Sequence, residues 1–393
     1  MPWQHSGVQG KRVWPIASSP DVLETRWKIL LESKDRSEAF KESTDRLIAS
    51  SYPQFHPACP DTTAIGSLPT DMSCPAPQPY GYRSFDRQFI IADGRLLSRP
   101  RQPLWQSFSP RQFFFASVFT QPLNIGPALT VSANVPDLHY FRGSFGAKDI
   151  FPLYRDAAAT QPNLHPQLLP LLQKTFGASI TAEDVAAYLY AALAQPVFTA
   201  RFHKELESRE LHVPLTADAT RFARAVALGR ELLFLHSYGE RCANGQSWPA
   251  PSAKCIKAVP AGGLPEKFAY DEARQVISVG TGEFGPVPKA VWDYEVSGLK
   301  VVQSWLGYRM RNRKGKKSSP LDEIAPKEWS GEYTSEFLRL LNLLTRTVEL
   351  QPTQSTLLDA ILAGPLLDAS MLGPVPEQWR SAPKQSASHG LDL

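Results

Sequence analysis

Prolines constrain the fold of this chain more than any other feature of its sequence. There are 35 prolines in 393 residues. Proline fixes one backbone torsion and lacks an N–H donor, so it interrupts helix interiors and central strands. Residues 50–80 are especially rich in proline and predict an irregular covering loop. We therefore expect many short elements joined by long connections.

The spacing of apolar residues changes along the chain and predicts a mixed α+β fold. Aromatic and β-branched runs are typical of strands, and they occur at Phe85–Ala92, Gln112–Phe119 and Ala128–Val131, with shorter runs between residues 254 and 279. Apolar positions three and four residues apart are typical of helices. This spacing predicts helices at residues 18–31, 181–193, 199–211, 217–238, 334–349 and 355–362.

A chain of 393 residues is long enough for a substantial core and for two or three subdomains. Composition changes divide it more finely. The expected parts are an N-terminal segment (1–50), a β-rich part (51–160), a helical subdomain (161–245), a mixed strand part with a basic segment (246–330), a C-terminal helix pair (331–372) and a flexible tail (373–393). The predicted architecture is a sheet-containing part beside a helical subdomain and a C-terminal helix pair.

The cysteines and the hydropathy of the sequence indicate the cellular compartment in which the protein is expected. The four cysteines, Cys59, Cys74, Cys242 and Cys255, form no CxxC pair. This spacing favours reduced thiols over a disulfide framework or a zinc site. The sequence has no apolar signal core and no run of about 18 apolar residues, so we expect a cytoplasmic protein without a membrane span.

Positive charge is segregated along the chain. The net charge is only +4, but residues 300–317 carry seven Lys or Arg and no acid, and residues 83–111 carry six Arg and two Asp. These stretches therefore hold +7 and +4, which leaves −7 for the remainder. Such segregation is the electrostatic signature of a nucleic-acid binder.

The stretch from Trp305 to Ile324 is the densest basic segment. Its charges alternate with Met310 and Asn312, a pattern that suits an extended or hairpin segment with the charges on one side. Gly315 provides a flexible tip. Guanidinium and ammonium groups at this density suit a polyanion, and phosphate contacts dominate nucleic-acid affinity. The alternative is a solvated basic loop.

A second group of arginines follows an aromatic strand. Tyr82, Phe85 and Trp105 lie among these arginines and suit stacking on nucleic acid, although the aromatics are expected to fill a small β core. The candidate DNA-binding residues are Arg83, Arg87, Arg95, Arg99, Arg101, Lys148, Arg309, Arg311, Arg313, Lys314, Lys316 and Lys317.

Two motif matches carry little weight. Pro20–Asp21 and Glu32–Lys34 fit the loose PD…ExK pattern of metal-dependent nucleases, but they bracket one predicted helix, so the carboxylates would lie more than two turns apart. Gly280–Gly285 reads GxGxxG, but prolines follow where a phosphate-binding helix must begin, which predicts a turn. We predict no catalytic, cofactor-binding or metal-binding residues.

Four stretches carry a resemblance to a known family. They are Ser6–Trp14, Tyr82–Arg87 (YRSFDR), Phe151–Tyr154 (FPLY) and Trp292–Gly298 together with Trp305–Ile324. The chain resembles the C-terminal target-recognition region of type ISP restriction–modification enzymes and related N6-adenine DNA methyltransferases. The resemblance implies that the sheet-containing part recognises double-stranded DNA. Ser84 stands where the family commonly has proline.

The motifs that are missing qualify this resemblance. The chain contains no Asn-Pro-Pro and no G-x-x-x-x-G-K-[ST] phosphate loop. The resemblance implies that S-adenosylmethionine and the methylated base are held by a methyltransferase core, present as an upstream domain or as a separate subunit. We therefore expect no methyl transfer by this chain alone.

Three functions remain open from the sequence. The first is sequence-specific recognition of double-stranded DNA for a restriction–modification or adenine methyltransferase system of phage defence. The second is a protein–protein scaffold of a defence complex, in which the basic stretch binds an acidic partner. The third is a nuclease or methyltransferase with an unrecognised site.

Overall fold

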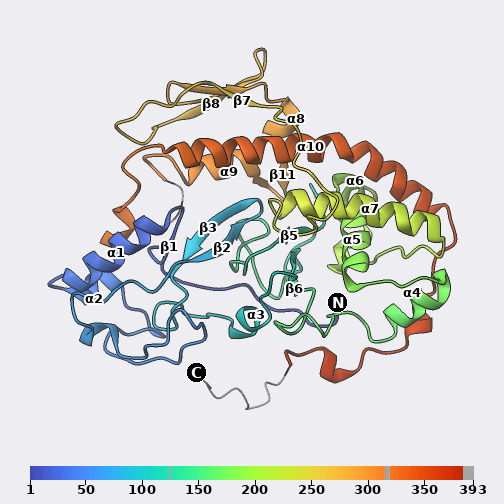
Figure 1. Cartoon of the computed structure of the whole chain (residues 1–393), viewed down its shortest axis with the longest axis horizontal. Coiled ribbons are helices and arrows are strands. Elements are labelled where there is room, and N and C mark those ends of the chain that lie inside the picture. The colour runs from blue at the N-terminus through green and yellow to red at the C-terminus, as the bar shows by residue number, and fades with distance from the viewer. Residues whose placement is uncertain (124, 314, 316–318, 384–393) are drawn as a thin grey trace.

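The computed structural model describes residues 1–123, 125–313, 315 and 319–383. Within these residues helices and several small antiparallel sheets share one continuous apolar core that extends from Val8 to Ile361 (Figure 1). The predicted mixed α+β fold is confirmed. The finer six-part division remains a prediction. The predicted flexible end of the tail lies mostly outside the described residues.

The YRSFDR motif forms the hairpin turn of a three-stranded sheet. Its strands, in the order β1-β3-β2, are β1 (Ile16–Ala17), β2 (Gln78–Arg83) and β3 (Asp86–Ile90). Gln78 pairs with Ile90, and the hairpin turns through Phe85, which has a φ of 65° and is buried. The strand predicted at Phe85–Ala92 is thus confirmed in its central part, whereas β2 was not foreseen from the sequence.

A second sheet contains the Phe-rich run and the FPLY motif. Its strands, in the order β5-β4-β6, are β4 (Phe114–Ala116), β5 (Thr130–Ser132) and β6 (Ile150–Pro152). Phe113, Phe114 and Phe115 are all buried, because β4 is the central strand and both of its faces are covered. The expectation that aromatics fill a β core is met by Tyr82 and Phe85, whereas Trp105 is only partly buried.

Helices pack beside these two sheets (Figure 1). The helix predicted at residues 181–193 is confirmed, and a capping box stabilises its start, where the Thr181 side chain accepts from the backbone of Asp184. Gly229 allows two helices to approach closely, because a Cβ there would lie 1.8 Å from the carbonyl oxygen of Ala187. These helices are α4 (Leu168–Phe176), α5 (Ala182–Leu193), α6 (Pro196–Arg201) and α7 (Ala219–His236). The helix predicted for 199–211 ends early, at Arg201.

One long helix spans the molecule where a helix pair was predicted. α10 (Gly331–Leu362) runs unbroken for 32 residues, with Pro352 inside it. The predicted break was wrong because tertiary packing outweighs the local cost of proline. Leu350, Gln354 and Leu358 continue the buried stripe past Pro352, and the side-chain amide of Gln354 donates to carbonyl groups at the end of α5.

A four-stranded antiparallel sheet lies on the outer side of α10 (Figure 1). The GxGxxG segment forms the turn and strand of a hairpin in this sheet, as the following prolines indicated, and not a loop that opens a helix. The strands, in the order β7-β10-β9-β8, are β7 (Lys254–Lys257), β8 (Phe268–Asp271), β9 (Val276–Val279) and β10 (Gly282–Gly285).

Short elements connect the larger parts. The helix predicted at residues 18–31 is confirmed as α1. The remaining helices and strands are α1 (Pro20–Glu32), α2 (Arg36–Phe40), α3 (Gln102–Gln106), α8 (Lys289–Trp292), β11 (Glu295–Val296), β12 (Leu299–Lys300) and α9 (Val301–Gly307), with single 3-10 turns at Ile65–Ser67, Glu205–Ser208, Pro320–Glu323, Ala369–Leu372 and Glu377–Trp379. No helix among the described residues is long and apolar enough to cross a lipid bilayer.

Candidate nucleic-acid interface

Three of the predicted DNA-binding arginines lie in the protein core. Arg83, Arg95 and Arg309 are each less than a tenth exposed. Each pairs with a buried aspartate: Arg83 Nη1 lies 2.7 Å from Asp137, and Arg95 Nη2 lies 2.6 Å from Asp93. A buried guanidinium requires such a partner, and its donors are then occupied. These contacts are those of a structural role, and DNA binding by the three residues remains a prediction.

Arg309 links two of the segments that carry the family resemblance. Its Nη2 donates to Asp86 of the YRSFDR hairpin at 2.9 Å, and its guanidinium carbon lies 3.8 Å from the ring centroid of Trp305. Burial disfavours the charged form, but attraction to Asp86 outweighs it and raises the pKa of Arg309. The expectation that the basic stretch is extended with its charges on one side is therefore wrong: Arg309 points inward, and α9 includes the stretch's first three residues.

Two further candidates lie at the surface in ion pairs. Arg87 Nη1 lies 2.8 Å from Glu240, and its guanidinium stacks 3.9 Å from the ring centroid of Tyr238. Arg311, which is exposed, forms an ion pair with Glu266. A surface pair contributes little stability and exchanges readily, so both cations are accessible to a phosphate that displaces the acid.

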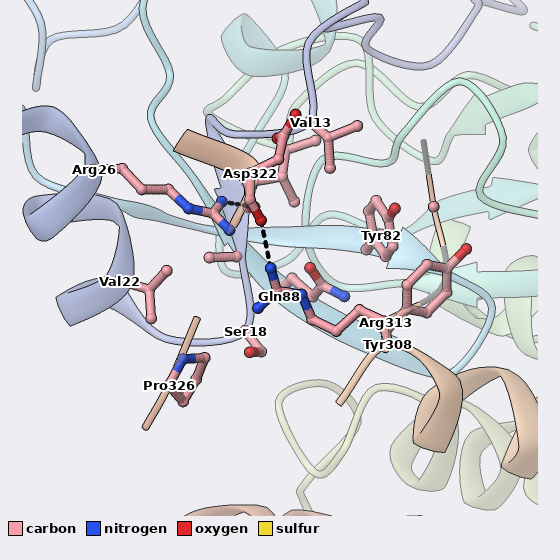
Figure 2. A pocket seen from close by; sticks show the side chains of 13 residues that line it. Val13, Ser18, Val22, Arg26, Tyr82, Gln88, Tyr308, Arg313, Asp322 and Pro326 are labelled. Carbon is pink, nitrogen blue, oxygen red and sulfur yellow. Dashed lines mark hydrogen bonds between the residues drawn. The ribbon is translucent and has the colours of Figure 1, made fainter. Parts of the chain in front are cut away.

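Figure 2 shows where the basic stretch meets the rest of the fold. A pocket of about 60 Å³ lies between α1, the β2–β3 hairpin and the chain after α9, lined by Tyr82, Gln88 and Tyr308 among others. Arg26 donates to the carbonyl oxygens of three core-facing residues, and Arg313 donates to that of Asp322. Arg313 thus lies at the pocket edge. The candidates Lys314, Lys316 and Lys317 lie outside the described residues.

The remaining three candidates come together on the folded chain. The N-terminal segment pairs with the chain near Arg99 through a β-bridge at Gln9. It pairs with the chain near Lys148 through a second β-bridge, between His5 and Ile150. We call Arg99, Arg101 and Lys148 the basic cluster. Burial lowers the pKa of His5, and repulsion from Arg101 and Lys148 adds to the shift, which indicates that His5 lies near both cations.

Among the described residues, the side chains of the basic cluster form no ion pair with an acid. Burial lowers the pKa of Arg101, and the neighbouring charge of Arg99 lowers it further. The Nε atom of Arg101 is buried without a hydrogen-bond partner. Arg99 and Lys148 are exposed. Unpaired cations gathered in this way are costly for a free protein and suit a polyanionic ligand.

Reasoning from sequence missed residues beside this cluster. His5 was not a candidate, nor were Arg142 and Phe145, although Phe145 is 53% exposed and Arg142 lies 5.3 Å from the centroid of its ring. The available signal was an Arg and an aromatic residue within a glycine-rich segment that also contains Lys148.

The alternative catalytic patterns find no support in the fold. Asp21 and Glu32 lie at opposite ends of α1, about 16 Å apart at 1.5 Å per residue. Among the described residues, no group of three or more His, Cys, Asp or Glu side chains is placed to hold a metal ion. The PD…ExK match thus brings no carboxylates together.

Comparison with known proteins assigns the family. The family model described as the Type ISP C-terminal specificity domain matches residues 1–340. No curated protein sequence matches.

Three solved structures resemble the chain closely enough to show its fold. The first is the DrdV–DNA complex (TM-score 0.59, 17% identity, 90% of this chain covered). The second is a nuclease-deletion mutant of the Type ISP restriction–modification enzyme LlaGI in complex with a DNA substrate mimic (0.54, 16%, 89%). The third is the ATP-dependent Type ISP restriction–modification enzyme LlaBIII bound to DNA (0.58, 13%, 93%).

This chain spans only 35%, 32% and 23% of the lengths of those three proteins. The predicted resemblance is confirmed by the family model, which covers most of the chain. The chain belongs to the family of Type ISP C-terminal specificity domains.

Proposed function

We propose that this chain recognises a specific sequence in double-stranded DNA on behalf of a restriction–modification enzyme. Its family and the DNA-bound state of its structural relatives support this assignment. The observation that carries it is the basic cluster, in which Arg99, Arg101 and Lys148 converge from separate segments without an acid partner among the described residues. A cytoplasmic location follows from this proposal.

Different basic groups serve different roles in this proposal. The basic cluster contacts DNA phosphates and sets the position of the protein on the duplex. Arg311 and Arg313, with Lys314, Lys316 and Lys317, are further phosphate contacts, and Arg87 is a candidate for contact with a base edge. For Arg83, Arg95 and Arg309, whose predicted DNA binding is untested, we propose that they hold the recognition surface from within.

Catalysis belongs elsewhere in this proposal. A methyltransferase core, as an upstream domain or a separate subunit, binds S-adenosylmethionine and receives the target base after the specificity domain has docked. The absence of an Asn-Pro-Pro motif from the sequence supports this division. Methyl transfer from S-adenosylmethionine to duplex DNA by the purified chain alone would contradict it.

Removal of the basic cluster tests the proposal. We expect the triple variant R99A/R101A/K148A to bind a fluorescein-labelled duplex more weakly than the unaltered chain in an anisotropy titration. The slope of log affinity against log salt should flatten by about 0.9 for each phosphate that the variant no longer neutralises. Full affinity and an unchanged slope, in a variant with an unchanged melting temperature, would refute a role for the cluster.

A control variant removes the same charge from other sites. R201A/R274A/K289A also deletes three cations, but each of them pairs with an acid in the free chain: Asp359, Glu283 and Glu272, respectively. If net charge alone governed binding, this variant would lose as much affinity as the first. We expect it to keep both its affinity and its salt slope.

A further inference from the structure

The loop between Phe141 and β6 presents an aromatic side chain to solvent in a strained backbone conformation. Phe145 has a φ of 58°, in the left-handed region that a bulky residue rarely adopts. Such strain persists only where the surrounding structure enforces it. The side chain is 53% exposed, so burial of the ring does not offset the free-energy cost of this backbone conformation.

Contacts on both sides hold this loop in place. The side-chain hydroxyl of Thr120 donates to the carbonyl oxygen of Phe145 at 2.6 Å. Gly146 packs so closely that a Cβ there would lie 1.5 Å from the carbonyl oxygen of Leu138. Asp149, at the foot of the loop, accepts from the backbone of both Phe119 and Ala147. The position of Phe145 is therefore fixed before any ligand binds.

The surroundings of the ring are positively charged. The guanidinium of Arg142 lies 5.3 Å from the ring centroid, its Nε atom is buried without a partner, and it reaches the turn after β11 through Ser297 at 3.5 Å. Lys148 of the basic cluster lies three residues farther along the same loop. An exposed ring with a guanidinium over its face and a lysine in the same loop suits a partner that combines flat apolar faces with negative charge, as stacked bases and their phosphates do.

We propose that Phe145 inserts between two adjacent base pairs of the bound duplex and kinks the DNA there. Apolar side chains used in this way partly unstack one base step and bend the duplex by about 20–90°. The basic cluster and Arg142 hold the phosphates on either side while the ring enters. This inference rests on the proposed DNA binding, but it assigns a separate role to one residue.

Replacement of Phe145 by glycine removes the ring and relieves the backbone strain. Glycine adopts a positive φ without cost, so F145G should melt at no lower temperature than the unaltered chain. The DNA is the duplex that the chain enriches from a random-sequence pool, labelled with a fluorescence donor and acceptor at its two ends. Energy transfer between the dyes reports the bend.

We expect binding of the unaltered chain to raise energy transfer, and saturating F145G to leave it at the value of the free duplex. The affinity of F145G should fall by about 5- to 150-fold, the effect of removing one aromatic side chain from a base stack. F145W should retain the bend. I256A, which removes an exposed apolar side chain from the outer sheet, should behave as the unaltered chain.

Two results would overturn the inference: an unbent duplex in the complex of the unaltered chain, or an equal bend with F145G. Both leave DNA recognition intact. If the unaltered chain bound no duplex at all, the proposed function itself would fail, so the two failures are distinguishable. Loss of a protein partner by F145G, with DNA bending unchanged, would reassign the ring to a protein interface.

Discussion

Replacement of Arg309 by methionine tests whether the densest basic segment is anchored in the core. The guanidinium of Arg309 is fully buried against Asp86, which is itself only 3% exposed. Methionine retains most of the apolar volume but leaves the carboxylate without its cation. Removing one partner of a buried pair costs about 3–5 kcal/mol. We expect a loss of this size in the free energy of unfolding, measured by urea titration of tryptophan fluorescence.

A neighbouring arginine supplies the control. Arg311 pairs with Glu266 at the surface, where both side chains are more than half exposed, so R311M should change stability by less than about 1 kcal/mol. The double variant R309M/D86L removes both charges and should lose less stability than R309M alone. A stability of R309M within about 1 kcal/mol of the unaltered chain would refute the structural role. So would a flattened salt slope of DNA binding in folded R309M.

Two other predictions concern the helical part. Burial lowers the pKa of His236 to about 3 from 6.5, so the unfolded chain binds a proton that the folded chain does not. Relative to H236Q, the unaltered chain should lose about 1.4 kcal/mol of stability for each pH unit between about 6.5 and 3, as measured by urea unfolding. G229A should destabilise the chain by about 1–3 kcal/mol or more because its Cβ meets the backbone of Ala187. G331A, with open space around it, should not; equal melting temperatures for the two variants would contradict the close helix approach.

Local signals in the sequence predicted local structure well. The helices predicted at residues 18–31 and 181–193 and the turn predicted at the GxGxxG segment follow from short-range rules and are confirmed. The break at Pro352 was wrong because the same local rules omit the packing of Gln354 against α5. Where propensity and tertiary contacts disagree, the sequence alone does not reveal which prevails.

For the candidate site too, some features were predictable from the sequence and others were not. The sequence correctly indicated the family, but it could not separate buried from exposed arginines. Arg309 and its partner Asp86 are 223 residues apart, so no sequence pattern joins them. The basic cluster likewise forms only because the N-terminal segment bridges Arg99 and Ile150. The roles of the exposed cations stay predictions until DNA binding is measured.

Selection of DNA by the purified chain tests the central claim most directly. The chain is incubated with a pool of duplexes that carry a random central segment, and bound duplexes are recovered, amplified and sequenced over successive rounds. We predict that one short sequence is enriched, and that changing a single base pair within it weakens binding by about 5- to 150-fold, equivalent to roughly 1–3 kcal/mol. Recovery of a pool that stays random, with equal affinity for all duplexes, would contradict target recognition by this chain.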